Sequence, residues 1–134
     1  FERRNGIRAR VDSGQVQVLG SSGTVTTLAG VLRGLRRYDR AQVDGTVIEF
    51  DDARRLCRWL LSLDRAERAG VPCIGRDRAD LVVVGCAVLE AILDKWPAGQ
   101  LRVADRGVRE GILFDLMAGW HAAARRVERR PLDG

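Results

Sequence analysis

The chain has 134 residues, 46% of them hydrophobic and 31% charged, and this composition excludes a wholly disordered protein. The net charge is +5, and arginine supplies nearly all of it because Lys95 is the only lysine. Acidic residues are interleaved with the arginines, so a mixed solvated surface is favoured over binding of nucleic acid.

The cysteine content and the chain's apolar segments predict a reduced, cytoplasmic protein. Three cysteines at wide spacing argue against a disulfide framework and against a zinc site: Cys57, Cys73 and Cys86. The longest apolar run, residues 81–89, is too short to cross a bilayer, and residues 1–4 do not resemble a signal peptide. We therefore expect no membrane partner.

A strand, a glycine turn and a helix are predicted after a polar lead-in segment at residues 1–14. Alternating apolar residues predict the strand over 15–19, and the Gly-Ser-Ser-Gly sequence at 20–23 ends it. From Thr24 the apolar period becomes helical. The predicted buried face contains Val25, Leu28, Ala29, Leu32 and Leu35. This order is typical of the start of an α/β unit.

A loop at 38–45, a short strand at 46–50 and two helices follow. Asp51 is expected to cap the first helix. The buried stripe of that helix contains Ala53, Leu56, Cys57, Leu60 and Leu63. Asp64 and Glu67 have the spacing of a capping box, which predicts a second, short helix ended by Gly70 and Pro72.

The segment from Asp80 to Lys95 is apolar on nearly all sides, which predicts a helix buried on most sides. Gly85 in its middle costs roughly 1 kcal/mol relative to alanine, and the usual reason for such a glycine is another backbone passing close by. A strand over 100–104, with Leu101 and Val103 inward, and a turn at 105–107 come next. The last predicted helix carries Val108, Ile112, Leu113, Leu116 and Met117.

The candidate site is the turn Gly20-Ser21-Ser22-Gly23-Thr24 between the first strand and its helix. Glycines allow a tight turn and leave backbone N–H groups uncovered. The helix N-terminus adds unpaired amides and partial positive charge, which favour phosphate oxygens, and the three hydroxyls can add donors. A plain turn with a Ser or Thr helix cap remains the alternative.

The other polar residues have simpler explanations or stay open. His121 is the only histidine and cannot build a metal site by itself. Helix capping explains Asp51 and Asp52. Arg76 and Arg78 precede the apolar helix, where they either reach an anion or lie in solvent. No catalytic and no metal-binding residue is predicted.

Five segments stand in a characteristic order: GSSGTVTTLA at 20–29, YD at 38–39, PCIG at 72–75, RADLVVVGCAVLEAI at 78–92 and VADRGVREGIL at 103–113. Together they resemble the C-terminal lobe of the Ppx/GppA phosphatases, the exopolyphosphatase and guanosine pentaphosphatase family. The resemblance covers residues 15–118, and we expect a basic tail at 119–134.

The resemblance implies an α/β fold: a second-lobe fragment of the actin-like, ribonuclease H-like fold, with few strands packed with several helices. In that fold the 20–24 turn faces a nucleotide or a phosphate chain. The 80–95 helix becomes the buried connecting helix near the interlobe hinge, where close helix packing gives Gly85 its reason.

The resemblance also implies a parent enzyme that releases the terminal phosphate of polyphosphate or of guanosine pentaphosphate. The implied chemistry is water attack assisted by a glutamate, with Mg²⁺ neutralising charge. The family's two aspartate-glycine phosphate loops and its catalytic glutamate have no position in this sequence. We therefore expect a fragment that lacks its N-terminal lobe, binds no Mg²⁺ by itself and is inactive alone.

The residues expected to contact phosphate are Gly20, Ser21, Ser22, Gly23, Thr24 and Arg78. Arg109 is a further candidate for the cleft. Two other hypotheses stay open: a non-catalytic module that binds polyanions or self-associates through an exposed sheet edge, and a kinase or chaperone relative that binds ATP.

Overall fold

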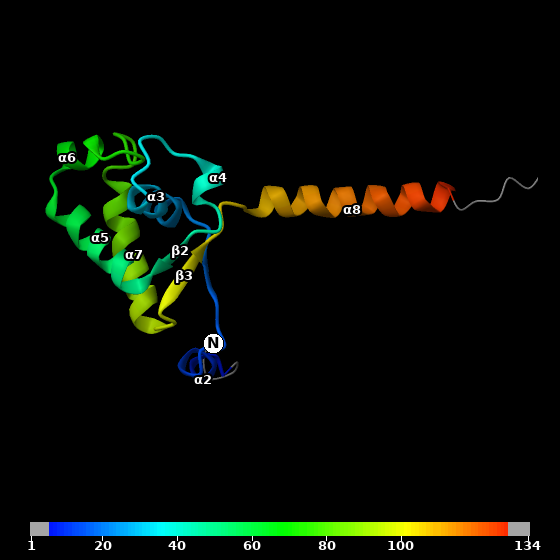
Figure 1. Cartoon of the computed structure of the whole chain (residues 1–134), viewed down its shortest axis with the longest axis horizontal. Helices are drawn as coiled ribbons and strands as arrows, with labels where there is room; N and C mark the ends of the chain where they lie inside the picture. Colours follow the sequence, from blue (N-terminus) through cyan, green and yellow to red (C-terminus); the bar gives the residue numbers. More distant parts are fainter. Residues whose placement is uncertain (1–5, 129–134) are drawn as a thin grey trace, which may run out of the picture.

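The structure is a computed structural model that describes residues 6–128, and the side chains of residues 6–120. Within these residues seven helices combine with a three-stranded sheet, and the last helix extends away from the rest (Figure 1). The strands are β1 (Val18–Gly20), β2 (Val47–Glu49) and β3 (Gln100–Val103). The helices are α2 (Ile7–Asp12), α3 (Gly23–Leu32), α4 (Arg40–Val43), α5 (Phe50–Ser62), α6 (Arg65–Gly70), α7 (Leu81–Lys95) and α8 (Val108–Glu128).

The sheet has the order β1-β3-β2, with β1 parallel and β2 antiparallel to β3. Leu101 and Val103 on the central strand are each 1% exposed, so the predicted inward positions are confirmed. Beyond the last pair of β1 and β3, the Ala104 N–H donates to the Gly20 carbonyl at 2.9 Å. The two parallel strands therefore end side by side, at the point where the Gly20–Thr24 turn begins.

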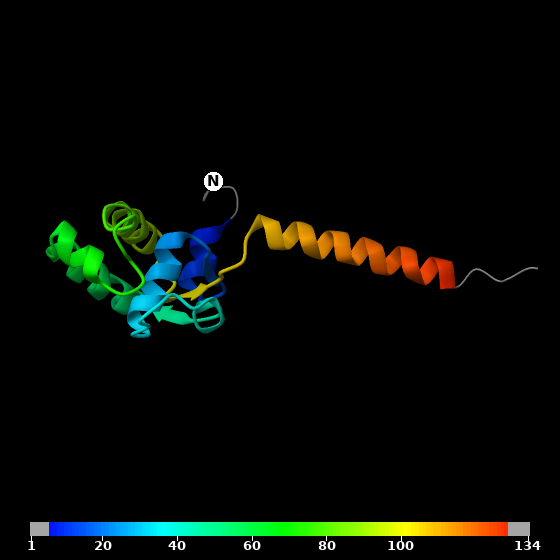
Figure 2. The same cartoon turned by 90° about the horizontal axis from the view of Figure 1, so that it is seen from above.

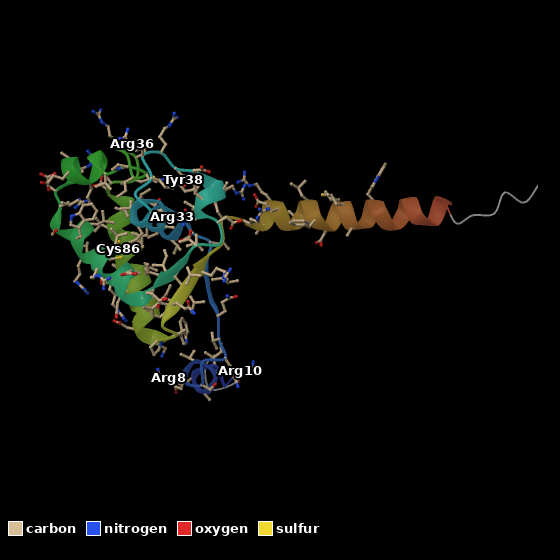
Figure 3. All side chains as sticks on the ribbon, in the orientation of Figure 1. Arg8, Arg10, Arg33, Arg36, Tyr38 and Cys86 are labelled. Atoms are coloured by element: carbon tan, nitrogen blue, oxygen red, sulfur yellow. The ribbon has the colours of Figure 1, made fainter. Side chains whose placement is uncertain are left out.

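The core lies where α3, α5 and α7 pack together beside the sheet. Its largest fully buried side chains include Leu28, Leu60 and Leu93. Cys57 on α5 contacts Cys86 on α7, and both side chains are buried. Figure 3 shows Cys86 inside the body. The hydrogen bond between the two thiols, together with burial, raises the pKa of Cys57. This cysteine therefore stays protonated and serves as core packing.

Helix α3 ends earlier than its apolar pattern suggests. Val25, Leu28 and Ala29 are buried as predicted, but Leu32 is 41% exposed. Gly34 has a φ of 65°, and the N–H of Leu35 donates to the Gly30 carbonyl at 3.0 Å. This is the hydrogen bond of a Schellman motif, which ends the helix before Leu35. Leu35 is nevertheless half-buried and packs against the core from beyond the helix end.

The capping predictions have mixed outcomes. Asp64 and Glu67 form the predicted capping box, and α6 follows it. The prediction that Asp51 caps α5 is wrong, because the helix begins at the buried Phe50, two residues earlier than that cap requires, and Asp51 falls in its first turn. The loop predicted at 38–45 contains the short helix α4, which Asp39 caps by accepting from the Ala41 N–H at 3.0 Å.

The prediction that the 80–95 helix is buried on most sides is wrong. α7 buries only Val82, Cys86, Leu89 and Leu93. Leu81 is 67% and Val84 64% exposed, because α3 and α5 cover one face of the helix and leave these side chains in solvent.

The close helix packing predicted at Gly85 is confirmed. An added Cβ there would lie 2.9 Å from Cβ of Thr24 and closer still to its hydroxyl oxygen. The approaching group is thus a side chain on α3 and not another backbone.

Helix α8 leaves the body through residues 104–107 and projects away from it in both views (Figures 1 and 2). Every described side chain from 111 to 120 is exposed. The predicted apolar residues of this helix are Val108, Ile112, Leu113, Leu116 and Met117, and they are 54–79% exposed. None of the described helices combines the length and the apolar character that a membrane crossing needs.

Candidate functional site

The predicted phosphate turn joins the end of β1 to the start of α3. Gly20 must be a glycine, because an added Cβ would lie 2.6 Å from a methyl group of Val25. Ser21, Ser22 and Gly23 are exposed, so the turn is open to solvent. No acidic residue lies in the first turn of α3, and the partial positive charge of this helix end is not offset there.

The Ser22 hydroxyl has a structural task. Ser22 is the N-cap of α3, and its Oγ accepts from the Val25 N–H at 3.4 Å. The capping alternative is therefore true for this one side chain. The first intrahelical hydrogen bond runs from the Thr26 N–H to the Ser22 carbonyl. The N–H groups of Gly23 and Thr24 precede it and are left for a ligand or solvent.

Three cavities meet at this turn. One of about 230 Å³ is lined by Gly23, Thr24, Thr27, Arg78, Leu81 and Val82. A second of about 500 Å³ is lined by Ser21, Arg40, Arg109 and the start of α8. A third, about 430 Å³, is an apolar groove between β1 and α7 that shares Ser21 and Thr24 with the other two.

The structure thus brings most of the predicted residues together. All five turn residues line at least one of the three cavities. Arg78 lines the same cavity as Gly23 and Thr24, although Arg78 lies 54 positions after Thr24 in the sequence. Arg109 reaches the cavity beside Ser21. Arg76 lines none of these three cavities, and Arg36, in the connection after α3, points away from the body (Figure 3).

A polar network that sequence reasoning missed borders the cavity beside Ser21. Arg40 donates to the Asp105 carbonyl and, at 2.9 Å, to Glu110, while the Tyr38 hydroxyl donates to the Asp105 carboxylate. Burial and this hydrogen bond raise the pKa of Tyr38 to about 12. The Gly107 N–H and then Arg40 lower the pKa of Glu110 to about 2.

This network fixes the first turn of α8 next to the phosphate turn. Asp44 extends it by accepting from the Asp105 N–H at 2.9 Å and from Arg106 at 3.1 Å. The spacing of Gly107 and Glu110 matches a helix cap and could have revealed one of these contacts. Nothing in the local sequence pairs Arg40 with residues 105–110. Asp105 is the turn residue expected, but it also holds this network together.

The described residues do not fit a resident Mg²⁺ ion. They contain no group of three or more His, Cys, Asp or Glu residues that could hold a metal. The two carboxylates that line the cavity beside Ser21, Asp105 and Glu110, both pair with Arg40. The side chain of His121 lies outside the described ones. Exposed amides, hydroxyls and arginines suit an anion instead.

Comparison with known proteins identifies the family. The sequence model of the Ppx/GppA phosphatase family matches residues 3–119, so the chain belongs to this family. A putative exopolyphosphatase of Haemophilus influenzae is 30% identical over 110 residues, which are 82% of this chain and 32% of that protein. Exopolyphosphatase 2 of Mycobacterium tuberculosis is 26% identical over 102 residues, 73% of this chain and 32% of its own.

Solved structures confirm the fold. A Ppx/GppA family member from Aquifex aeolicus matches 88% of this chain and 41% of its own with a TM-score of 0.73 at 21% identity. An exopolyphosphatase-like protein matches 84% of this chain and 42% of its own with a TM-score of 0.69 at 28% identity. The chain thus has the expected α/β architecture of part of an actin-like fold, and it spans about a third of the length of its curated relatives.

Proposed function

We propose that this chain supplies the phosphate-binding wall of a phosphoanhydride hydrolase that removes the terminal phosphate of polyphosphate. The observation that carries the proposal is the open turn at the N-terminus of α3, which has Arg78 on one side and Arg109 on the other. Two relatives named exopolyphosphatase support polyphosphate as the substrate. Guanosine pentaphosphate, with the same terminal phosphoanhydride, is the second substrate we propose.

In this proposal the turn binds and orients the phosphate chain. The N–H groups of Gly23 and Thr24 donate to phosphate oxygens, and the partial charge of the helix end stabilises the anion. The hydroxyl of Ser21 and the guanidinium of Arg78 add donors from two sides. These groups hold an anion but do not activate water.

The hydrolytic step therefore belongs to a second lobe that closes over the turn. No described carboxylate at the turn is left for general-base work, since Asp105 and Glu110 pair with Arg40. We propose that the N-terminal lobe of the same protein supplies that base and any Mg²⁺ that the reaction uses. As part of the same proposal the protein acts in the cytoplasm, which suits the three free thiols among the described residues.

A calorimetric titration of the purified chain with tripolyphosphate measures the binding affinity and tests this function. Gly23→Val is the informative variant, because an added Cβ meets nothing within 4 Å and the larger side chain instead covers the first-turn amides. We expect it to weaken binding at least about tenfold, the cost of losing roughly one charge-assisted hydrogen bond. Gly111→Val on α8, equally free of contacts, is the matched control.

Two results would contradict the proposal. One is an unmodified chain that does not bind tripolyphosphate. The other is equal binding by the chain and by the Gly23→Val variant. The expected inactivity of the chain alone is checked separately: phosphate release from polyphosphate above the level of the Gly23→Val variant would show that no second lobe is needed.

A second candidate function rests on exposed apolar surface. Val88 on α7 and Leu113 on α8 are 56% and 57% exposed, and both helices present further apolar side chains to solvent. Such surface favours a non-catalytic module that self-associates or binds polyanions through scattered arginines. Sedimentation then detects an assembly, and polyanion affinity falls steeply with salt without responding to Gly23→Val.

A further inference from the structure

Helix α3 buries two adjacent threonines, and their hydroxyls are used differently. Thr26 is 4% and Thr27 1% exposed, and a buried hydroxyl requires a hydrogen-bond partner. The Thr26 hydroxyl donates to the Gly23 carbonyl at 3.2 Å, within its own helix. The Thr27 hydroxyl instead accepts from Nη1 of Arg78 at 3.1 Å. Thr27 therefore connects the core to a residue that is 51 positions further along the chain.

Arg78 is otherwise free to serve a ligand. Six other described arginines pair with carboxylates, as Arg65 does with Asp80 at 2.9 Å. Among the described residues, the Arg78 guanidinium has no carboxylate partner, and the one hydrogen bond of this side chain goes to Thr27. A guanidinium carries five N–H donors in a rigid plane, so most of them remain available.

The anchored arginine and the first turn of α3 share one space. Arg78, Thr27, Gly23 and Thr24 line the same cavity of about 230 Å³. An arginine at an exposed position normally samples many rotamers, and ordering it on binding costs conformational entropy. A hydrogen bond to a buried, stiff threonine removes part of that cost before the ligand arrives.

We propose that Thr27 is a positioning residue whose buried hydroxyl holds the Arg78 guanidinium over the cavity at the start of α3, ready for a phosphate group. This inference rests on the proposed function, because it assigns Arg78 to the same phosphate site. It adds a residue that touches no ligand itself and that the turn sequence does not point to.

Thr27→Val tests the anchor, since valine keeps the shape of threonine and removes the acceptor oxygen. Thr26→Val is the matched control, because it deletes the neighbouring buried hydroxyl, which bonds to the Gly23 carbonyl and to Tyr38 but not to Arg78. Thr27→Ser restores the oxygen and should rescue. Far-UV circular dichroism and thermal unfolding of each variant establish that the body is folded before any comparison is made.

Two readouts separate the anchor from the site. The first, without ligand, is ¹⁵N relaxation of the Arg78 Nε–H: we expect an ordered group in the unmodified chain, in Thr26→Val and in Thr27→Ser, and a mobile one in Thr27→Val. The second is the affinity for tripolyphosphate, which should fall about fivefold to tenfold in Thr27→Val alone, as the loss of one buried hydrogen bond implies. In an Arg78→Ala background Thr27→Val should have no further effect on affinity.

Each outcome decides one of the two claims. An Arg78 signal that is equally ordered in Thr27→Val overturns the anchor, whatever the affinities are. The Arg78 Nε–H signals can follow the expectation, mobile only in Thr27→Val, while the unmodified chain does not bind tripolyphosphate. This result supports the anchor and overturns the phosphate site. Additive losses in Thr27→Val and Arg78→Ala would mean that Thr27 does not act through Arg78, which also overturns the inference.

Discussion

Helices α7 and α8 are both rich in apolar residues, but they are held in place by different forces. α7 packs Val82, Cys86, Leu89 and Leu93 against the rest of the body. α8 buries none of its described residues beyond its first turn and is attached through the polar contacts of Glu110. The body therefore depends on α7 for its core, whereas the described apolar side chains of α8 lie exposed to solvent.

The largest expected effect lies on the buried face of α7. Leu93 is fully buried, and Leu93→Ala should lower the free energy of unfolding by about 2–5 kcal/mol through lost burial and the cavity left behind. Urea unfolding followed by circular dichroism measures it. Val84→Ala on the exposed face of the same helix is the control and should cost far less. Equal losses at both positions would mean that α7 has no preferred face.

A glycine on each helix provides a matched pair. Gly85→Ala should destabilise the body by about 1–3 kcal/mol, because the new methyl group collides with Thr24 and overpacking is costly. Gly119→Ala on α8 has open space around it and should strengthen its helix by up to about 1 kcal/mol. Thermal unfolding reports the first change and amide hydrogen exchange along α8 the second. A neutral Gly85→Ala would contradict the close approach of α3.

The attachment of α8 should respond to pH. Because the folded-state pKa of Glu110 is about 2, below its ordinary value of 4.5, its stabilising contacts are complete above pH 4.5 and are lost as the pH falls toward 2. Arg40→Gln removes the second cause of this shift and leaves the larger one, the Gly107 N–H. The pKa should therefore rise but stay below 4.5.

A carboxyl titration of Glu110 by NMR measures this rise. Arg55→Gln is the control, since Arg55 pairs with Asp52 on α5 and has no contact with α8. An unchanged pKa of Glu110 in Arg40→Gln would show that the arginine does not hold the first turn of α8 in solution. The claim that polar contacts attach α8 to the body would then be wrong.

Local sequence patterns predicted what local interactions determine. The capping box of Asp64 and Glu67 and the inward residues of β3 depend on neighbours in sequence, and both are confirmed. At Gly85 the local pattern predicted a passing backbone and was wrong about that, because the Thr24 side chain makes the close approach. The five turn residues also lie at open cavities as expected. Phosphate binding itself stays a prediction.

The failures concern partners that are distant in sequence. An apolar pattern such as that of α7 predicts that the surface of the helix is buried. It does not show which element packs on each face, or whether any element does. The pairing of Arg40 with residues of the α8 start joins positions 65 and 70 residues apart. The bond between Thr27 and Arg78 spans 51 residues. Such contacts depend on the tertiary fold, so composition and spacing do not reveal them.

The smallest expected effect is also the sharpest test of the comparison. Leu116 on α8 is 65% exposed, so Leu116→Ala should change the free energy of unfolding of the body by less than about 0.5 kcal/mol, as exposed positions usually do. Alanine also favours helix slightly more than leucine, which keeps α8 itself intact. Urea unfolding at low protein concentration gives the value for single molecules. A loss comparable with that of Leu93→Ala would mean that α8 folds back onto the body, and the open phosphate turn next to its first residues would then be covered.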